Sequence, residues 1–296
     1  MRKSLENRTG AGYSFLAPAI IFYLVFFLFP VAFSFLTSFK RWNMLTPFIN
    51  APFIGFKNFL DLLRDDLFIM ALRNTLFYAI LTVSITLVLA LFYAVMINKA
   101  RFSVLWRFIY FAPVVTPQVA IATIWGYLYN PNSGLLNAIL RAIGLKGLNW
   151  LTDPNVALFS VILTAVWAGL GGSMLIFTAS LNNIPQEYYD AANLDGATGF
   201  KEFWNITLPL LKPTLLFLSA TGLISAWQVF DLPYMLGRNA PAKSVITVSW
   251  YTYEIAFQDL KMGKASAGAF LLFIAIFIIT LIVLRLFGKE GIEGYE

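Results

Sequence analysis

Three acidic residues, Glu187, Asp190 and Asp195, stand close together between two long uncharged runs of the chain. Clustered carboxylates can act as general acid and base or hold a metal ion when a nucleophile or further ligands accompany them. The chain contains no His and no Cys, so thiolate and imidazole chemistry and Cys/His metal sites are excluded. The acids lack metal-ligand spacing as well. We therefore expect neither catalytic nor metal-binding residues, and no enzyme activity.

The residues from 182 to 212 predict a short helix–turn–helix unit that carries these acids. Asn183 is a helix-capping residue type, and Gln186 follows three residues later as the partner of a capping box. Good helix formers continue to Leu194, and Gly196 supplies the left-handed conformation that ends such a helix. A second short helix then leads toward the next uncharged run. The acids are expected at the tip of this unit.

The uncharged runs on both sides indicate a membrane protein. Of 296 residues, 59% are hydrophobic and only 12% are charged, whereas about a quarter of a soluble domain is charged. A bilayer core of about 30 Å requires about 20 apolar helical residues. We predict an all-α membrane protein whose single transmembrane domain covers residues 1–296 with six transmembrane helices. The spans are expected at about 14–38, 74–98, 108–129, 156–181, 213–230 and 265–284.

Several segments have a more specific pattern. Residues 57–73 predict an amphipathic helix on the membrane surface. Residues 231–264 predict an outer loop, in which the stretch SVITVSWYTYEIAF (244–257) fits either a strand or a surface helix. In the third span, Pro113 and Pro117 free backbone carbonyls that must face protein or water. That span is either the wall of a pathway or a packing kink. In the fourth span, glycines favour close helix packing. They are Gly169, Gly171 and Gly172.

The loop also resembles a family motif. Asp190-Ala191-Ala192 is followed at fixed spacing by Gly196, Ile206, Leu208 and Pro209. This pattern is similar to the cytoplasmic loop in membrane subunits of ABC importers, where Glu usually stands in place of Asp190. Asp195-Gly196-Ala197 resembles the variant in carbohydrate importers. The resemblance implies that residues 182–212 form a cytoplasmic coupling helix unit, with Glu187, Asp190, Ala191, Ala192, Asp195 and Gly196 contacting an ATPase.

Other landmarks extend the resemblance over most of the chain. They are Gly55-Phe56-Lys57-Asn58-Phe59, Gly134-Leu135-Leu136-Asn137, Trp150-Leu151-Thr152-Asp153-Pro154 and Tyr253-Glu254-Ile255-Ala256-Phe257. Each looks like a segment of the maltose-type sugar permeases. One departure is Gly237-Arg238-Asn239-Ala240-Pro241, where many relatives have a Gly-Gly-Pro run.

The resemblance implies a type I ABC importer permease core that moves a sugar or related solute. The implied partners are a second permease, usually a distinct homologue, two ATPase subunits that bind ATP and Mg, and an extracytoplasmic solute-binding protein. The implied location is a bacterial or archaeal plasma membrane, with both termini cytoplasmic. Clusters of Lys and Arg in the tail 1–13 and the link 99–107 favour that orientation mildly. The net charge of +6 suits lipid headgroups better than nucleic acid, since no basic stripe alternates with aromatic residues.

A sugar site needs aromatic faces and a few polar side chains in a mostly apolar cavity. In and beside the spans, candidates for a substrate path are Gln118, Trp125, Trp167, Trp227, Gln228 and Asp231. For each tryptophan, packing or lipid contact is the more favoured interpretation. The two glutamines are the stronger candidates because an amide facing hydrocarbon is costly.

Two other function classes fit the sequence less well. A secondary carrier or channel working without an ATPase commonly keeps a charged group inside the membrane, and the six spans contain none. A polytopic membrane enzyme would need a polar catalytic cluster. A nucleotide site is also not expected, because GRNAPAKS at 237–244 has Ala242 where the second glycine of a P-loop belongs.

Overall fold

The computed structural model describes residue 13 and residues 15–98, 102–238 and 240–291. Most of the predicted tail 1–13 lies outside the described residues, as do residues 99–101 of the basic link and Asn239. The described part of the chain is built from helices and contains one isolated bridge, between Lys40 and Phe53, and no β-strand. The predicted all-α class is confirmed.

In the described part of the chain, four helices are long and apolar enough to cross a membrane, and two bent helix pairs raise the number to six if each pair is one span. The four are Phe15–Ser38, α4 (Asp66–Asn98), α8 (Ala157–Asn182) and Met262–Arg285 of α15 (Met262–Gly291). The bent pairs are Ser103–Val115 with α6 (Gln118–Leu128), and Phe200–Leu210 with α12 (Lys212–Trp227). Each of the six segments overlaps one of the six predicted runs, but α4 begins at Asp66 rather than at about 74, and the last bent pair begins at Phe200, inside the predicted loop 182–212.

The helices fall into two compact units. One unit holds the described residues up to Asp65 together with Thr252–Leu271, and the other holds Asp66–Tyr251 together with the described residues from Leu272. In the first unit, the buried amide of Asn58 donates to the carbonyls of Ser38 and Lys40 at 2.7 and 3.0 Å. A salt bridge of 2.8 Å joins Lys264 to Asp65.

The short elements of the first unit correct one prediction. The surface helix expected at 57–73 ends early, because α3 covers only Lys57–Leu63 and α4 begins at Asp66. Asp66 favours a helix start, since its carboxylate lies in the first turn near the positive end of the helix dipole. The other elements of this unit are the π-helical turn η1 (Leu24–Leu28), α2 (Phe29–Ser38), η2 (Phe48–Asn50) and η6 (Glu254–Gln258).

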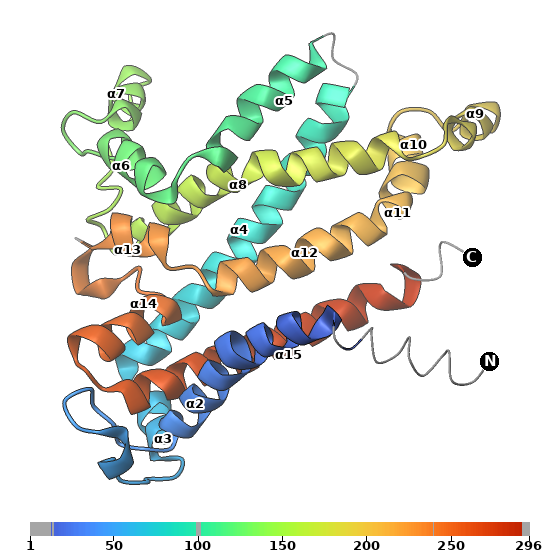
Figure 1. The fold of residues 1–296 in the computed structure, drawn as a ribbon. Helices are drawn as coiled ribbons and strands as arrows, with labels where there is room; N and C mark the ends of the chain where they lie inside the picture. The colour runs from blue at the N-terminus through green and yellow to red at the C-terminus, as the bar shows by residue number, and fades with distance from the viewer. Residues whose placement is uncertain (1–12, 14, 99–101, 239, 292–296) are drawn as a thin grey trace, which may run out of the picture. The chain divides into compact units, whose positions relative to one another are not determined.

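In the second unit, α4 packs against α8 and α12, which both cross it (Figure 1). Ala90 and Ala94 of α4 are fully buried there, against Met174 and Phe177 of α8 and Leu218 of α12. Small residues on α4 let the two other helices approach closely, as is usual where helices associate in lipid. This cluster is the core that holds the fourth and fifth spans to the second.

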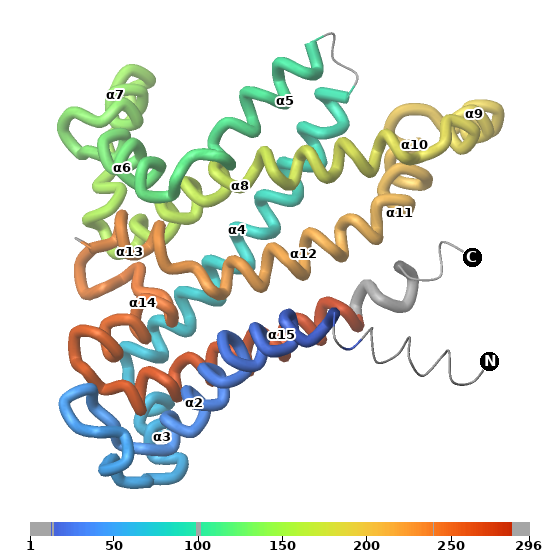
Figure 2. Tube along the Cα trace, viewed as in Figure 1, coloured from blue at the N-terminus to red at the C-terminus, as the bar shows by residue number. Residues whose placement is uncertain are grey.

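The third span is broken rather than continuous. It consists of α5 (Ser103–Phe111), the 3-10 turn η3 (Ala112–Val115) and α6, and the chain bends by 100° between η3 and α6 (Figure 2). Thr116 is extended, as the residue before a proline tends to be, and Pro117 then caps α6. The prolines thus cause the break that the sequence indicated.

The remaining elements of this unit settle two further expectations. The predicted fifth span 213–230 stops at Trp227, because Gln228 and Val229 leave the helix before α13 (Asp231–Gly237) begins. After η5 (Pro241–Lys243), the segment that fitted either strand or surface helix forms α14 (Val248–Tyr253), followed by η6. Asn74 anchors this segment, since its amide donates to the carbonyls of Ser244 and Ile246.

Gly171 is the glycine on which the packing of α8 against α5 depends. A Cβ at this position would collide with the carbonyl oxygen of Tyr110, whereas a Cβ at Gly169 would have no heavy atom closer than 4.0 Å. We predict that Gly171→Ala lowers the free energy of unfolding by about 1–3 kcal/mol, as overpacking does. Thermal denaturation in detergent measures this, with Gly169→Ala as the matched control. Equal melting temperatures for the two variants would contradict the assigned contact.

Candidate functional site

The acidic loop is centred on the helix α9 (Gln186–Leu194), which extends beyond the ends of α8 and α12 (Figure 1). The predicted capping box is wrong. Pro185 is the N-cap of α9 and provides no side-chain hydrogen bond, while Asn183 ends α8 as its C-cap. The fixed φ of Pro185, −61°, sets the entry to the helix in place of a side-chain cap.

The end of α9 follows the prediction. Gly196 has φ of +74°, in the left-handed region, and its N–H donates to Asn193 O at 3.1 Å. The N–H of Ala197 donates to Ala192 O at 2.9 Å. These two bonds form a Schellman motif, which satisfies carbonyls that the helix end would otherwise leave free. Glycine is needed at position 196 because other L-residues are strained at this φ.

One face of α9 is open to its surroundings. Glu187, Asp190, Ala191 and Leu194 recur at the helical spacing that places them on one side, and all four are exposed. We call these four residues the outer face. The amide of Gln186 donates to the Asp190 carboxylate at 3.2 Å. Leu194, which sequence reasoning missed, is 90% exposed.

The other predicted residues of the loop lie beside the outer face. Asp195 and Gly196 are exposed at the helix end, whereas Ala192 is buried. Ala192 therefore packs toward the rest of the loop. Its small side chain lets the next segment of chain lie close behind α9.

The inner side of α9 contacts the chain that leads to the fifth span. The Tyr189 hydroxyl lies 3.3 Å from the Thr207 hydroxyl. A crevice of about 520 Å³ separates this side from the ends of α4 and α8, and Gln186, Asn193 and Glu202 are among its lining residues. The contact between Tyr189 and Thr207 thus joins α9 to the chain that leads to α12, with the crevice beside it.

The chain from α9 to α12 passes through short helical pieces. They are α10 (Phe200–Glu202), the π-helical turn η4 (Phe203–Thr207) and α11 (Leu208–Leu210). A bend of 63° at Leu211 separates them from α12. Leu211 is fully buried in the core with Met174 and Phe177. Leu211 thus fixes the start of α12 on α8.

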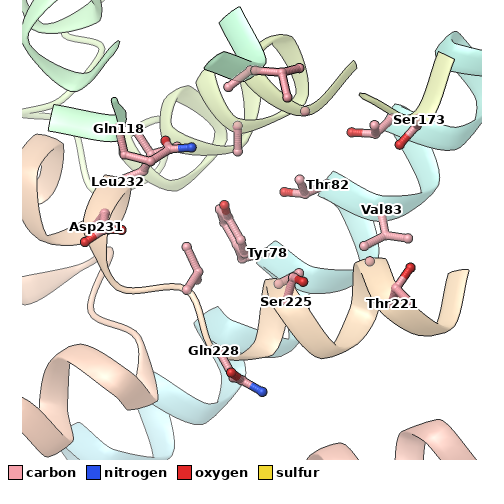
Figure 3. Close-up of a pocket in the computed structure, with 18 of the residues that line it drawn as sticks. Tyr78, Thr82, Val83, Gln118, Ser173, Thr221, Ser225, Gln228, Asp231 and Leu232 are labelled. Atoms are coloured by element: carbon pink, nitrogen blue, oxygen red, sulfur yellow. The ribbon is translucent and has the colours of Figure 1, made fainter. Parts of the chain in front are cut away.

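A cavity of about 580 Å³ lies in the second unit, lined by residues of α4, α8 and α12, by the break in the third span and by the segment that follows α12 (Figure 3). Val114 and Gln118 line it from the two sides of the third-span break, and Gln228 to Leu232 line it from the segment after α12. Thr247 holds that segment in place by donating its hydroxyl to Val229 O at 3.0 Å. The remaining polar lining residues carry hydroxyls: Tyr78, Thr82, Thr86, Ser173, Thr221 and Ser225.

The cavity brings together Gln118, Gln228 and Asp231, three of the six predicted path residues. In Figure 3, Tyr78 lies in the middle of the group, with Gln118 and Gln228 at opposite ends. Asp231 lies in the first turn of α13. Amides and hydroxyls supply hydrogen-bond donors and acceptors, and Asp231 adds one carboxylate, so this lining suits a polyhydroxylated molecule.

The three predicted tryptophans are not among the cavity-lining residues. Trp125 and Trp167 pack edge to face, with ring centroids 5.6 Å apart. Trp227 is buried. Sequence reasoning missed the hydroxyls of α4, although Tyr78, Thr82 and Thr86 recur every four residues within an apolar run. That spacing puts them on one helix face and could have identified them. Among the described residues, no group of three or more His, Cys, Asp or Glu could hold a metal ion.

Comparison with known proteins gives consistent matches. The family described as binding-protein-dependent transport system inner membrane component matches residues 68–289. The chain is 34% identical to a probable ABC transporter permease protein, YurN, of Bacillus subtilis (strain 168), over 94% of this chain and 97% of that protein. It is 35% identical to the lactose transport system permease protein LacF of Rhizobium radiobacter, over 86% of each chain.

A further relative and a solved structure extend the comparison. The chain is 32% identical to the arabinooligosaccharides transport system permease protein AraP of Bacillus subtilis (strain 168), over 99% of this chain and 93% of that protein. It superposes on a chain of a bacterial alginate ABC transporter, in complex with an alginate pentasaccharide-bound periplasmic protein. The TM-score is 0.85 at 25% identity, and the match covers 97% of this chain and 96% of the other. The type I importer fold is thus confirmed.

Gly196 provides a test of the helix end. We predict that Gly196→Ala destabilises the turn by about 1–2 kcal/mol, because alanine is strained in the left-handed region. Amide hydrogen exchange in the peptide covering residues 186–197 should accelerate. Gly196→Asn is the control and should be milder, since asparagine adopts this conformation more readily. Unchanged exchange in the alanine variant would refute the Schellman motif.

Proposed function

This chain belongs to the family of binding-protein-dependent transport system inner membrane components, and we propose that it carries a sugar or related solute across the membrane. It is a multi-pass membrane protein and the permease subunit of a binding-protein-dependent ABC importer. Relatives named for arabinooligosaccharides and lactose support a carbohydrate solute. The amide and hydroxyl lining of the cavity supports it independently.

The driving energy comes from partner subunits. Two ATPase subunits bind ATP and Mg, and their closure pulls on α9 through the outer face, Glu187, Asp190, Ala191 and Leu194. The observation that carries this proposal is the position of α9, which is exposed on one side and joined to the fifth span on the other. Asp195 and Gly196 lie at the end of the same helix and help to shape the contact.

The solute path uses the cavity between α4, α8 and α12. Movement of α9 acts through the Tyr189–Thr207 contact and the buried Leu211 on α12, whose Thr221 and Ser225 line the cavity. Such a shift opens the cavity alternately to the two sides of the membrane. Gln118, Gln228 and Asp231 are the path residues that the cavity lining supports. Trp125, Trp167 and Trp227 hold the surrounding helices.

The proposed importer requires further protein chains and a defined orientation of this chain in the membrane. A second permease, a distinct homologue of this chain, completes the path, and an extracytoplasmic binding protein delivers the solute. The protein lies in a bacterial or archaeal plasma membrane with both termini and α9 on the cytoplasmic side. The cavity-lining end of α12 and the start of α8 then lie toward the binding protein.

Charge reversal tests the contact with the ATPase. We predict that Asp190→Arg weakens co-purification of the ATPase subunits at least about tenfold. An acidic outer face implies a positively charged partner surface, and the arginine would place a like charge against it at a cost of several kcal/mol. Asp190→Glu keeps the charge and is the matched control, with undiminished association. Full ATPase association of the arginine variant would count heavily against the outer face as the docking site.

Filling the cavity tests the solute path. We predict that Thr221→Phe abolishes ATP-dependent, binding-protein-dependent uptake into proteoliposomes while the ATPase subunits remain bound, because the ring occupies the cavity. Thr123→Phe on α6 is the matched control, since both threonines are exposed and donate to the carbonyl four residues earlier. Equal uptake by the two variants would place the path elsewhere.

A further inference from the structure

The helix α7 (Leu135–Ala142), in the loop between α6 and α8, has one buried residue, the polar Asn137. Asn137 is 1% exposed and makes four hydrogen bonds. Its amide nitrogen donates to Pro131 O at 3.0 Å and Leu148 O at 2.9 Å. Its oxygen accepts from Leu148 N at 2.9 Å and from Trp150 Nε1 at 2.8 Å. The amide has no hydrogen-bonding capacity left, so this face of α7 is fixed against its own loop.

The apolar side of the same helix is left open. Leu135, Ile139 and Ile143 recur every four residues, and they are 57%, 50% and 66% exposed. A loop helix in water would bury these side chains and expose the asparagine. The reversed arrangement indicates that an apolar medium covers the stripe formed by these three residues. We call it the aliphatic stripe.

The position of α7 relative to a membrane span is fixed by hydrogen bonds. Ser160, in the first turn of the spanning helix α8, donates its hydroxyl to Trp150 O at 2.8 Å, and its own carbonyl accepts from the Tyr129 hydroxyl at 2.7 Å. Trp150 in turn donates to Asn137 of α7. The helix therefore lies at the level where α8 begins. Tyr and Trp gather at this level in membrane proteins.

The charges of the segment suit lipid headgroups. Between Tyr129 and Asp153 the only charged residues are Arg141 and Lys146. Both are exposed. Long basic side chains can extend from an apolar surface toward lipid phosphates. A protein partner is a poorer fit, because a stable interface has about 20–30 residues a side. An amphipathic helix needs only its own stripe to enter the bilayer interface.

We propose that α7 is a membrane-interface anchor at the end of α8 opposite to α9, with the aliphatic stripe among lipid acyl chains and Arg141 and Lys146 at the phosphates. The anchor holds the loop that carries Trp150 against the start of the fourth span. The fourth span then has a fixed depth in the bilayer at this end, while its other end connects to α9.

The absence of cysteine from the chain permits a clean test. Ile139→Cys and Ser133→Cys are each labelled with an environment-sensitive fluorophore in the full-length protein. Ser133 is the matched control, as an exposed polar residue of the same loop. The proteins are placed in nanodiscs of phosphatidylethanolamine and phosphatidylglycerol, with or without bromine on the acyl chains. We expect emission at shorter wavelength and loss of intensity with brominated lipid at position 139, and neither at position 133.

Any of three other outcomes would overturn the proposal. Emission at shorter wavelength without quenching by brominated lipid at position 139 would mean that protein covers the stripe. A change at position 139 only after addition of the solute-binding protein would assign the stripe to that partner. Water-like emission at both positions would leave α7 clear of the bilayer. A repeat at Leu135→Cys guards against a local folding defect at one site, because both residues belong to the same stripe.

Discussion

The structure depends on the rule that a backbone crossing lipid must satisfy its own hydrogen bonds. Six apolar segments meet this rule as helices, and two of them are interrupted. The first interruption, at Thr116–Pro117, and the non-helical residues that follow Trp227 release backbone groups that hydrocarbon cannot accept. Both of these irregular stretches border the same cavity, whereas the second interruption, at Leu211, lies in the core. The cavity is therefore where irregular backbone can exist at membrane depth, and the two stretches place Gln118 and Gln228 there at the helix ends.

This constraint also explains what the sequence could predict. Uncharged runs of about 20 residues leave few options in a bilayer, so the positions of the helices followed directly from composition. Helix ends did not. The start of α4 at Asp66 and the Pro185 cap of α9 depend on local backbone geometry, which a capping pattern does not determine. The left-handed Gly196 was predictable because one φ value is required there.

The cavity was predictable only in part, for a related reason. In the membrane, a polar side chain must face protein or water, so the two glutamines were sound candidates. A tryptophan can face lipid, a neighbouring helix or a cavity at similar cost, and its residue type does not distinguish these positions. Trp125 and Trp167 pack on each other. The hydroxyls of α4 were missed because a threonine in a span can satisfy its hydroxyl by bonding to its own helix. Thr82 and Thr86 make no such bond and line the cavity instead.

The two ends of α8 differ in how firmly their neighbouring segments are held. At one end, α9 exposes acids and Leu194 while holding the bundle through a small contact and a crevice. At the other end, two hydrogen bonds of Ser160, with Trp150 and Tyr129, tie the loop to α8, and four hydrogen bonds of Asn137 hold the loop together. A helix can transmit a movement only if the segment at one of its ends can move and the segment at the other end is held in place. Under the proposed function, the ATPase subunits act at the end of α8 that adjoins α9, where the acids are exposed.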